Sequence, residues 1–93
     1  MQTFAILRRS GWASPDDLEA AGKRSSAAIA DMDGQVRWLR SYVLNESDGR
    51  LGTVCIYMAG NADAVRRHAQ AADLPCDEII PVADLAVNEA DPT

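Results

Sequence analysis

The stretch from residue 36 to residue 58 constrains the fold most, because it has the pattern of a β-hairpin. It contains two runs rich in β-branched and aromatic residues, Val36–Leu44 and Leu51–Met58, a composition typical of strands. The polar segment between them includes Asp48-Gly49, a pair that supplies the positive φ angle of a tight turn. We therefore predict two antiparallel strands joined by this turn, with the rest of the chain arranged on either side.

The chain before the hairpin predicts one strand and one helix. Thr3–Arg9 is a short apolar run typical of a strand, and a loop is expected over residues 10–13. Ser14-Pro15 then suits a helix start, because serine can cap free amides and proline fits the first helical position. Apolar residues recur at helical spacing up to about Asp31, and Asp33-Gly34 is expected to end the helix.

The chain after the hairpin predicts one helix followed by one strand. Asn61 is expected to cap a second helix, which Leu74-Pro75 terminates. Glu78–Leu85 predicts a fourth strand, and Pro81 within it indicates a sheet edge because proline lacks a backbone N–H. We expect residues 1–85 to form one domain and residues 86–93 to form a flexible tail.

The order β-α-β-β-α-β favours an α+β ferredoxin-like plait. In that fold a four-stranded antiparallel sheet has its first and third strands in the middle, and both helices cover one face. The other face is open, and large apolar side chains on an open face usually meet a partner. We therefore expect a homodimer.

Composition excludes several functional classes. A chain of 93 residues supports one core, and a formal net charge of −5 argues against binding nucleic acid or an anionic membrane. The apolar run Phe4–Leu7 is far shorter than a secretory core or membrane span, so a cytoplasmic location with reduced Cys55 and Cys76 is expected. A Gly-rich phosphate loop is absent from the sequence, and no organic cofactor is expected.

The hairpin carries the side chains best suited to a site. Strand alternation predicts that Trp38, Arg40 and Tyr42 share one face, and that Cys55 and Tyr57 share one face of the neighbouring strand. Where these faces coincide, aromatic walls would suit a flat ligand and Arg40 would hold an anionic group. The alternative is that the aromatic residues pack at a dimer interface and Arg40 pairs with an acidic residue.

His68 is the only histidine and therefore the natural proton carrier at neutral pH. One interpretation makes it a general base, with Tyr42 or Tyr57 donating a hydrogen bond to a developing oxyanion, or a metal ligand together with Cys55. Histidine and cysteine prefer a late first-row metal such as nickel, copper or zinc. The other interpretation is a half-exposed histidine at the edge of the helix.

The chain resembles a family of short bacterial nickel-binding-like proteins of unassigned function. The likeness covers about residues 3–82, in the order W-x-x-S-Y-V (Trp38–Val43), C-x-Y (Cys55–Tyr57), R-x-H-A (Arg66–Ala69) and L-P (Leu74-Pro75). It implies a ferredoxin-like homodimer, nickel as a candidate metal, and functional roles for His68 and Cys55. The first strand departs from the family pattern, since Ile6–Arg9 replaces a start of the V-E-R type.

Three functions follow from these observations. The first is a small homodimeric protein that binds a ligand or a metal, with nickel the first candidate. The second is a small enzyme without cofactor, an isomerase, cyclase or hydrolase, in which His68 acts as general base on a flat anionic substrate. The third is an interaction module whose aromatic face is an interface.

Overall fold

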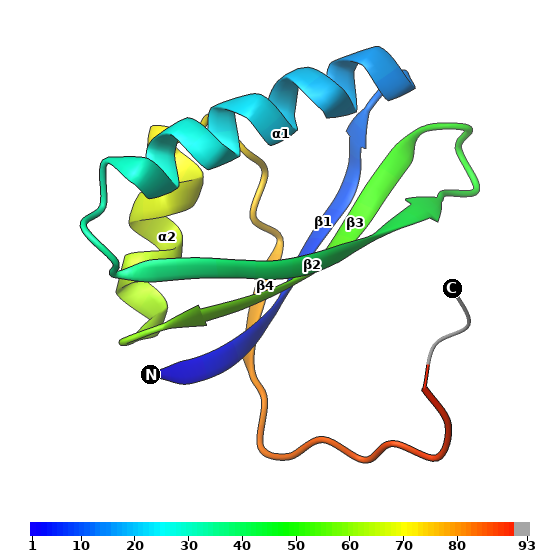
Figure 1. The fold of residues 1–93 in the computed structure, drawn as a ribbon. Helices are drawn as coiled ribbons and strands as arrows, with labels where there is room; N and C mark the ends of the chain where they lie inside the picture. The colour runs from blue at the N-terminus through cyan, green and yellow to red at the C-terminus, as the bar shows by residue number, and fades with distance from the viewer. Residues whose placement is uncertain (91–93) are drawn as a thin grey trace.

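The computed structural model describes residues 1–90 and has the predicted order of elements. The elements are β1 (Gln2–Trp12), α1 (Pro15–Ala30), β2 (Val36–Asn45), β3 (Leu51–Ala59), α2 (Ala62–Ala71) and β4 (Glu78–Pro81). The strands form one antiparallel sheet in the order β2-β3-β1-β4, so the first and third strands are central (Figure 1). The ferredoxin-like α+β plait is confirmed.

Local sequence signals explain where the helices begin. Ser14 accepts a hydrogen bond from the backbone N–H of Asp17 at 3.2 Å, with Pro15 at the first helical position of α1. Asn61 accepts one from the N–H of Ala64 at 2.9 Å at the start of α2. At the end of α2 the chain turns through Asp73, whose φ is 53°.

The core lies between both helices and one face of the sheet. That face contributes the buried residues Phe4, Ile6, Val36, Cys55, Tyr57 and Ala59. Ala64 and Val65 of α2 are buried in the same cluster, and Ile29 of α1 packs against it. Both helices therefore cover the same face, as predicted, and they are joined by a hydrogen bond of 2.9 Å from Arg24 Nε to the Ala72 carbonyl.

Two strand ends differ from the prediction by more than one residue. β1 continues to Trp12 through the residues expected to form a loop, because an irregularity between Arg8 and Trp12, with Ser10 at φ 48°, lets pairing resume at Trp12 opposite Leu51. β4 ends at Pro81 rather than Leu85, at the sheet edge that proline indicated, and the N–H of Val82 makes one further bond to Thr3 at 2.9 Å. Residues 86–90 form neither helix nor strand, and the last three residues of the predicted tail lie outside the described residues.

A β-bulge in β2 changes which residues face the helices. Trp38 lies opposite Tyr57 and Arg40 lies opposite Ile56, so Leu39 is one extra residue on this strand. Because one extra residue reverses the alternation, the prediction that Trp38, Arg40 and Tyr42 share a face is wrong. Trp38 faces the helices together with Ser41 and Val43, whereas Arg40 and Tyr42 lie on the open face.

The open face of the sheet carries apolar side chains from all four strands. Tyr42 and Ile80 are 45% and 43% exposed there, alongside the half-buried side chains of Leu7, Val54 and Ile56.

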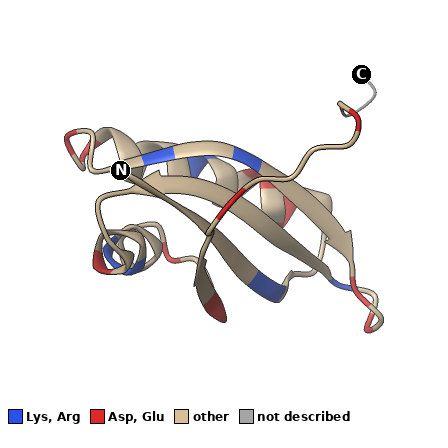
Figure 2. Cartoon of the chain, turned by 90° about the horizontal axis from the view of Figure 1, so that it is seen from below, with Lys and Arg blue, Asp and Glu red and all other residues tan. Residues whose placement is uncertain are grey.

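Acidic and basic residues are interspersed over the described chain rather than gathered by sign (Figure 2). Among residues 1–90, no helix is both long and apolar enough to cross a bilayer.

Candidate functional site

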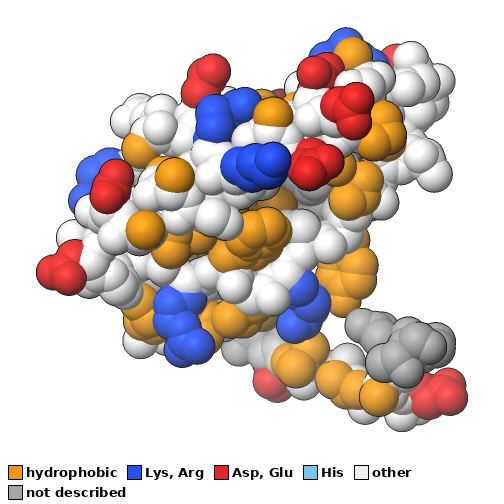
Figure 3. Space-filling model, turned by 45° about the horizontal axis from the view of Figure 1, so that its top comes forward, with side chains coloured by type: hydrophobic (Ala, Val, Ile, Leu, Met, Phe, Trp, Pro, Cys, Tyr) orange, Lys and Arg blue, Asp and Glu red, His pale blue; other side chains and the backbone are white. Residues whose placement is uncertain are grey.

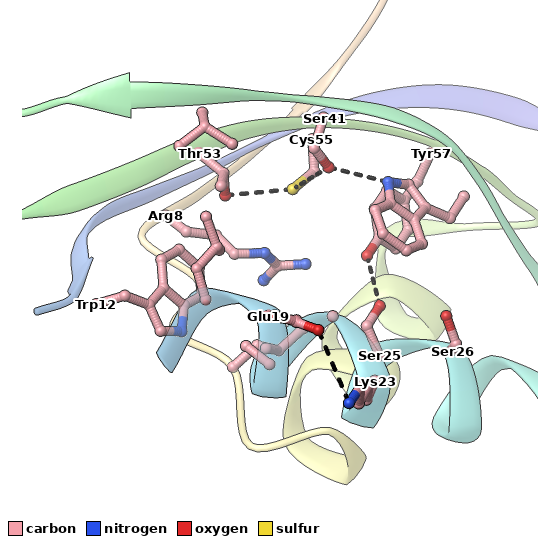
Figure 4. Close-up of a pocket in the computed structure, with 16 residues that line it drawn as sticks. Arg8, Trp12, Glu19, Lys23, Ser25, Ser26, Ser41, Thr53, Cys55 and Tyr57 are labelled. Carbon is pink, nitrogen blue, oxygen red and sulfur yellow. Dashed lines mark hydrogen bonds and ion pairs between the residues drawn. The ribbon is translucent and has the colours of Figure 1, made fainter. Parts of the chain in front are cut away.

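A cavity of about 650 Å³ lies between α1 and the helix-facing side of β1, β2 and β3. The space-filling view shows hydrophobic side chains at the centre of this side of the molecule, with charged side chains above and below them (Figure 3). The larger wall residues are Trp12, Leu18, Trp38, Val43, Tyr57 and Leu74. Polar groups enter from Arg8, Ser25, Ser41, Thr53 and Cys55 (Figure 4).

Arg8 brings a positive charge into this apolar cavity. It follows Phe4 and Ile6 on the inward face of β1 and is only 1% exposed. Its Nη1 donates to the Pro75 carbonyl at 2.6 Å, but its Nη2 has no hydrogen-bond partner among the described residues. The Arg8 side chain also lies near Tyr57, with its Cζ 5.8 Å from the centre of that ring. A buried guanidinium with unused N–H groups is costly unless a partner arrives.

Tyr57, Ser25 and His68 form a buried hydrogen-bonded chain behind the cavity. The Tyr57 hydroxyl lies 3.1 Å from Ser25 Oγ, and Ser25 Oγ lies 3.1 Å from His68 Nε2. His68 Nε2 also lies 3.3 Å from the Ser25 carbonyl oxygen, and the Tyr57 and His68 rings are 5.2 Å apart. β3 and both helices therefore meet at this chain.

Burial keeps Tyr57 and His68, the two titratable residues of this hydrogen-bonded chain, neutral. It raises the pKa of Tyr57, with the bond to Ser25 and the charge of Arg8 acting in the opposite direction. It also lowers the pKa of His68, and the positive charge of Arg8 adds to that effect, whereas the Ser25 carbonyl opposes it. At neutral pH the pair is therefore a phenol and an uncharged imidazole.

A second hydrogen-bonded chain runs across β2 and β3. Trp38 Nε1 donates to Ser41 Oγ at 2.9 Å, and Ser41 Oγ donates to Cys55 Sγ at 3.0 Å. Cys55 Sγ in turn donates to Thr53 Oγ1 at 3.3 Å. Cys55 is buried and forms no disulfide, so its free thiol acts as both acceptor and donor in this series of hydrogen bonds.

The structure brings together some of the predicted site residues and separates others. Trp38, Cys55 and Tyr57 line the cavity. His68 lies behind Tyr57 and is fully buried, so the interpretation of a half-exposed histidine is wrong. Arg40 and Tyr42 lie on the opposite face of the sheet, where Arg40 Nε donates to the Tyr42 hydroxyl at 3.2 Å.

The cavity also contains residues that the sequence analysis missed. Arg8 falls in the predicted first strand, Trp12 in the predicted loop and Ser25 within the predicted first helix, and none of the three was predicted as a site residue. The alternation Phe4, Ile6, Arg8 was a usable signal, because it places Arg8 inward. Nothing in the local sequence predicts that β1 extends to bring Trp12 into the wall.

The predicted metal ligands do not fit a nickel site within one chain. His68 Nε2 is engaged by Ser25, and Cys55 Sγ is engaged by Ser41 and Thr53. Within residues 1–90, no group of three or more His, Cys, Asp or Glu side chains could hold a metal ion. The cavity instead offers a cation and hydroxyl groups, which suit an anion.

Comparison with known proteins gives one family and one solved structure of similar fold. The model of the SCO4226-like family, described as nickel-responsive, matches residues 4–82. The crystal structure of SCO4226 from Streptomyces coelicolor A3(2) superposes with a TM-score of 0.74 at 25% identity, covering 90% of this chain and 99% of that one. Rv0793 from Mycobacterium tuberculosis has 15% identity and a TM-score of 0.36, with 98% of this chain and 100% of that one covered. No curated protein sequence matches the chain.

Proposed function

Because this chain belongs to the SCO4226-like family of nickel-responsive proteins, we propose that it is a small binding protein, and that its cavity binds an organic anion with a flat, apolar body. The observation that carries this proposal is Arg8, a buried residue that lines the cavity and whose Nη2 has no hydrogen-bond partner among residues 1–90. A carboxylate is the natural complement, because charge-assisted bonds from arginine to carboxylate are short and strong.

The shape and lining of the cavity support a flat ligand. Its volume of about 650 Å³ lies within the range of sites for small organic molecules. Trp12, Trp38 and Tyr57 supply aromatic walls, and Leu18 and Leu74 supply aliphatic ones. The charged residues Glu19 and Lys23 of α1 pair with each other at 3.8 Å and are well exposed, so they belong to the rim.

Nickel is the metal that the family description names. We propose that any response of this chain to nickel does not depend on a site built from His68 and Cys55 of one chain, because both side chains are buried and already hydrogen-bonded. A homodimer is supported by the open face of the sheet, where apolar side chains remain exposed. We propose that a second copy covers this face.

The enzyme hypothesis is supported by the Tyr57–Ser25–His68 chain, which has the form of a proton relay. Yet a relay must pass its proton onward, and His68 Nδ1 is buried with no hydrogen-bond partner among the described residues. Of the two tyrosines predicted to assist, Tyr42 lies on the other face of the sheet, whereas Tyr57 lines the cavity. The arrangement therefore supports binding better than general-base catalysis.

Calorimetry with 2-naphthoate tests the proposed function. The wild type should bind it more tightly than the neutral 2-naphthamide, and Arg8→Met should lose about 10-fold or more in affinity for 2-naphthoate, as expected when a charged hydrogen bond is removed. The matched control is Arg9→Met, because Arg9 is exposed and pairs with Glu46 at 3.0 Å instead. Equal affinities of the wild type and Arg8→Met would contradict the proposal.

A further inference from the structure

The two ring nitrogens of His68 have different surroundings, which indicates where its proton lies. Nε2 faces the Ser25 carbonyl oxygen at 3.3 Å and Ser25 Oγ at 3.1 Å. A carbonyl oxygen can only accept, so the nitrogen that faces it is best placed to carry the hydrogen. With the hydrogen on Nδ1, a buried N–H would lack an acceptor and the Nε2 lone pair would face the carbonyl. The hydrogen-bond partners therefore assign the Nε2–H tautomer.

This tautomer favours one direction for the hydrogen bond between Ser25 and Tyr57, because it leaves the Ser25 hydroxyl hydrogen free. When Nε2–H donates to Ser25, the hydroxyl hydrogen of Ser25 is available for the Tyr57 oxygen, 3.1 Å away. Tyr57 then accepts from Ser25 and keeps its own hydrogen for another partner. Ser25 Oγ is a hydrogen-bond partner of the Tyr57 hydroxyl, the Arg8 side chain also interacts with that hydroxyl, and Tyr57 lines the cavity.

We infer that His68 acts through Ser25 to fix Tyr57 as a hydrogen-bond donor into the cavity, where the Tyr57 hydroxyl and the Arg8 guanidinium together hold an oxyanion. The inference rests on the proposed function and narrows its ligand to molecules that present only acceptors, such as carboxylates. The guanidinium and the phenol ring are neighbours, with Arg8 Cζ 5.8 Å from the ring centre (Figure 4). His68 is thus a positioning residue, sealed from the ligand by Tyr57.

Two further features agree with this assignment. Burial raises the pKa of Tyr57, so the hydroxyl keeps the hydrogen that it donates. The lowered pKa of His68 keeps the imidazole neutral, so one nitrogen can remain without a proton in the core. The groups that face His68 are Ser25 of α1, Tyr57 of β3 and the more distant Arg8 of β1.

The tautomer can be measured in the free protein. His68 is the only histidine, so long-range ¹H–¹⁵N correlation NMR of protein labelled at histidine gives one unambiguous pattern. We expect the hydrogen on Nε2. A hydrogen on Nδ1 would reverse the direction of the chain and overturn the inference, whatever the cavity binds.

Binding of 2-naphthoate tests the role of the hydroxyl. Tyr57→Phe should lower the affinity about 10-fold, the effect of one hydrogen bond to a charged group, and it should narrow the preference for 2-naphthoate over 2-naphthamide. His68→Leu should have a similar effect, and His68→Gln should restore affinity because its amide nitrogen can replace Nε2–H. Thermal unfolding of each variant separates a loss of affinity from a loss of folding.

The outcomes distinguish this inference from the proposed function. Loss of binding in Arg8→Met with normal binding in Tyr57→Phe would overturn the inference and leave the proposed function standing. No binding of 2-naphthoate by the wild type would overturn the proposed function, and the NMR measurement would still decide the direction of the hydrogen bonds. Weak binding by His68→Gln equal to that of His68→Leu would also count against a positioning role.

Discussion

At the scale of single residues, the site depends on two buried side chains whose burial without a full set of hydrogen bonds lowers the stability of the fold. Within residues 1–90, Arg8 is a buried cation whose Nη2 has no hydrogen-bond partner, and His68 is a fully buried imidazole whose Nδ1 has none. Cores rarely keep such groups without a reason in structure or function. Here Arg8 faces the cavity, and His68 supports the tyrosine that lines it.

The lowered pKa of His68 predicts how stability depends on pH. In the unfolded chain His68 takes up a proton at about pH 6.5, whereas in the folded chain its pKa is lower. As pH falls, the unfolded state therefore binds the proton first. The unfolding free energy of the wild type should therefore decrease below about pH 6.5, by up to about 1.4 kcal/mol per pH unit, before the carboxylates titrate. Urea unfolding at pH 7.5 and pH 5 measures this loss. In His68→Gln this loss of unfolding free energy should be absent. An equal loss in the wild type and in His68→Gln would contradict the attribution of the pH dependence to His68.

Nickel binding should not depend on His68 or Cys55 of one chain. Calorimetry with nickel chloride on wild type, His68→Gln and Cys55→Ser should give the same heats for all three, because both side chains are buried and no group of three or more His, Cys, Asp or Glu side chains that could hold a metal ion is found among residues 1–90. A marked loss of nickel affinity in either variant, with folding intact, would restore the ligand set that the resemblance implied.

At the scale of the elements, backbone irregularities decide which side chains reach the cavity. The order of strands and helices could be predicted from periodicity, caps and the Asp48-Gly49 turn, and it was confirmed. The bulge at Leu39 and the extension of β1 to Trp12 could not, because both arise from pairing with β3 rather than from local propensity. Because of the one extra residue, Arg40 and Tyr42 lie on the open face. The arginine that lines the cavity is therefore Arg8 and not the predicted Arg40.

Gly52 holds β3 close to β1 and to the end of β2. A Cβ at this position would lie 2.7 Å from the Arg8 carbonyl oxygen and 2.7 Å from Glu46 Oε2. Glu46 also accepts hydrogen bonds from Arg9 and from the N–H of Ser10, so it has little room to move. Gly52→Ala should therefore destabilise the fold by about 1–3 kcal/mol.

The control is Gly60→Ala, because an added Cβ at Gly60 meets nothing within 4 Å. Its urea midpoint should match that of the wild type or exceed it slightly. Equal midpoints for Gly52→Ala and the wild type would show that β3 tolerates a wider separation than its register implies.

At the scale of the whole molecule, the sheet separates two surfaces with different roles. The cavity lies on the helix-covered face, and the open face presents apolar side chains from every strand. Sequence patterning predicted an open face and a partner for it, and the partner stays a prediction. The location of the cavity could not be predicted, because it is formed by residues far apart in the chain, from Arg8 to Leu74.

Self-association through the open face can be tested with one charge. Ile56 lies near the centre of that face, opposite Ala5 on β1 and Arg40 on β2, so Ile56→Glu should shift a dimer to a monomer in light scattering. The control Val87→Glu adds the same charge to a residue that is 65% exposed outside the sheet, and it should leave the mass unchanged. A wild type that is monomeric at all concentrations would contradict the proposed dimer.

The most direct measurement is a crystal structure of the wild type with 2-naphthoate. We expect the naphthyl ring inside the cavity between α1 and the sheet, with the carboxylate within hydrogen-bond distance of Arg8 Nη2 and the Tyr57 hydroxyl. A ligand seated on the open face beside Arg40, with the cavity empty and Arg8 Nη2 still unpaired, would contradict it.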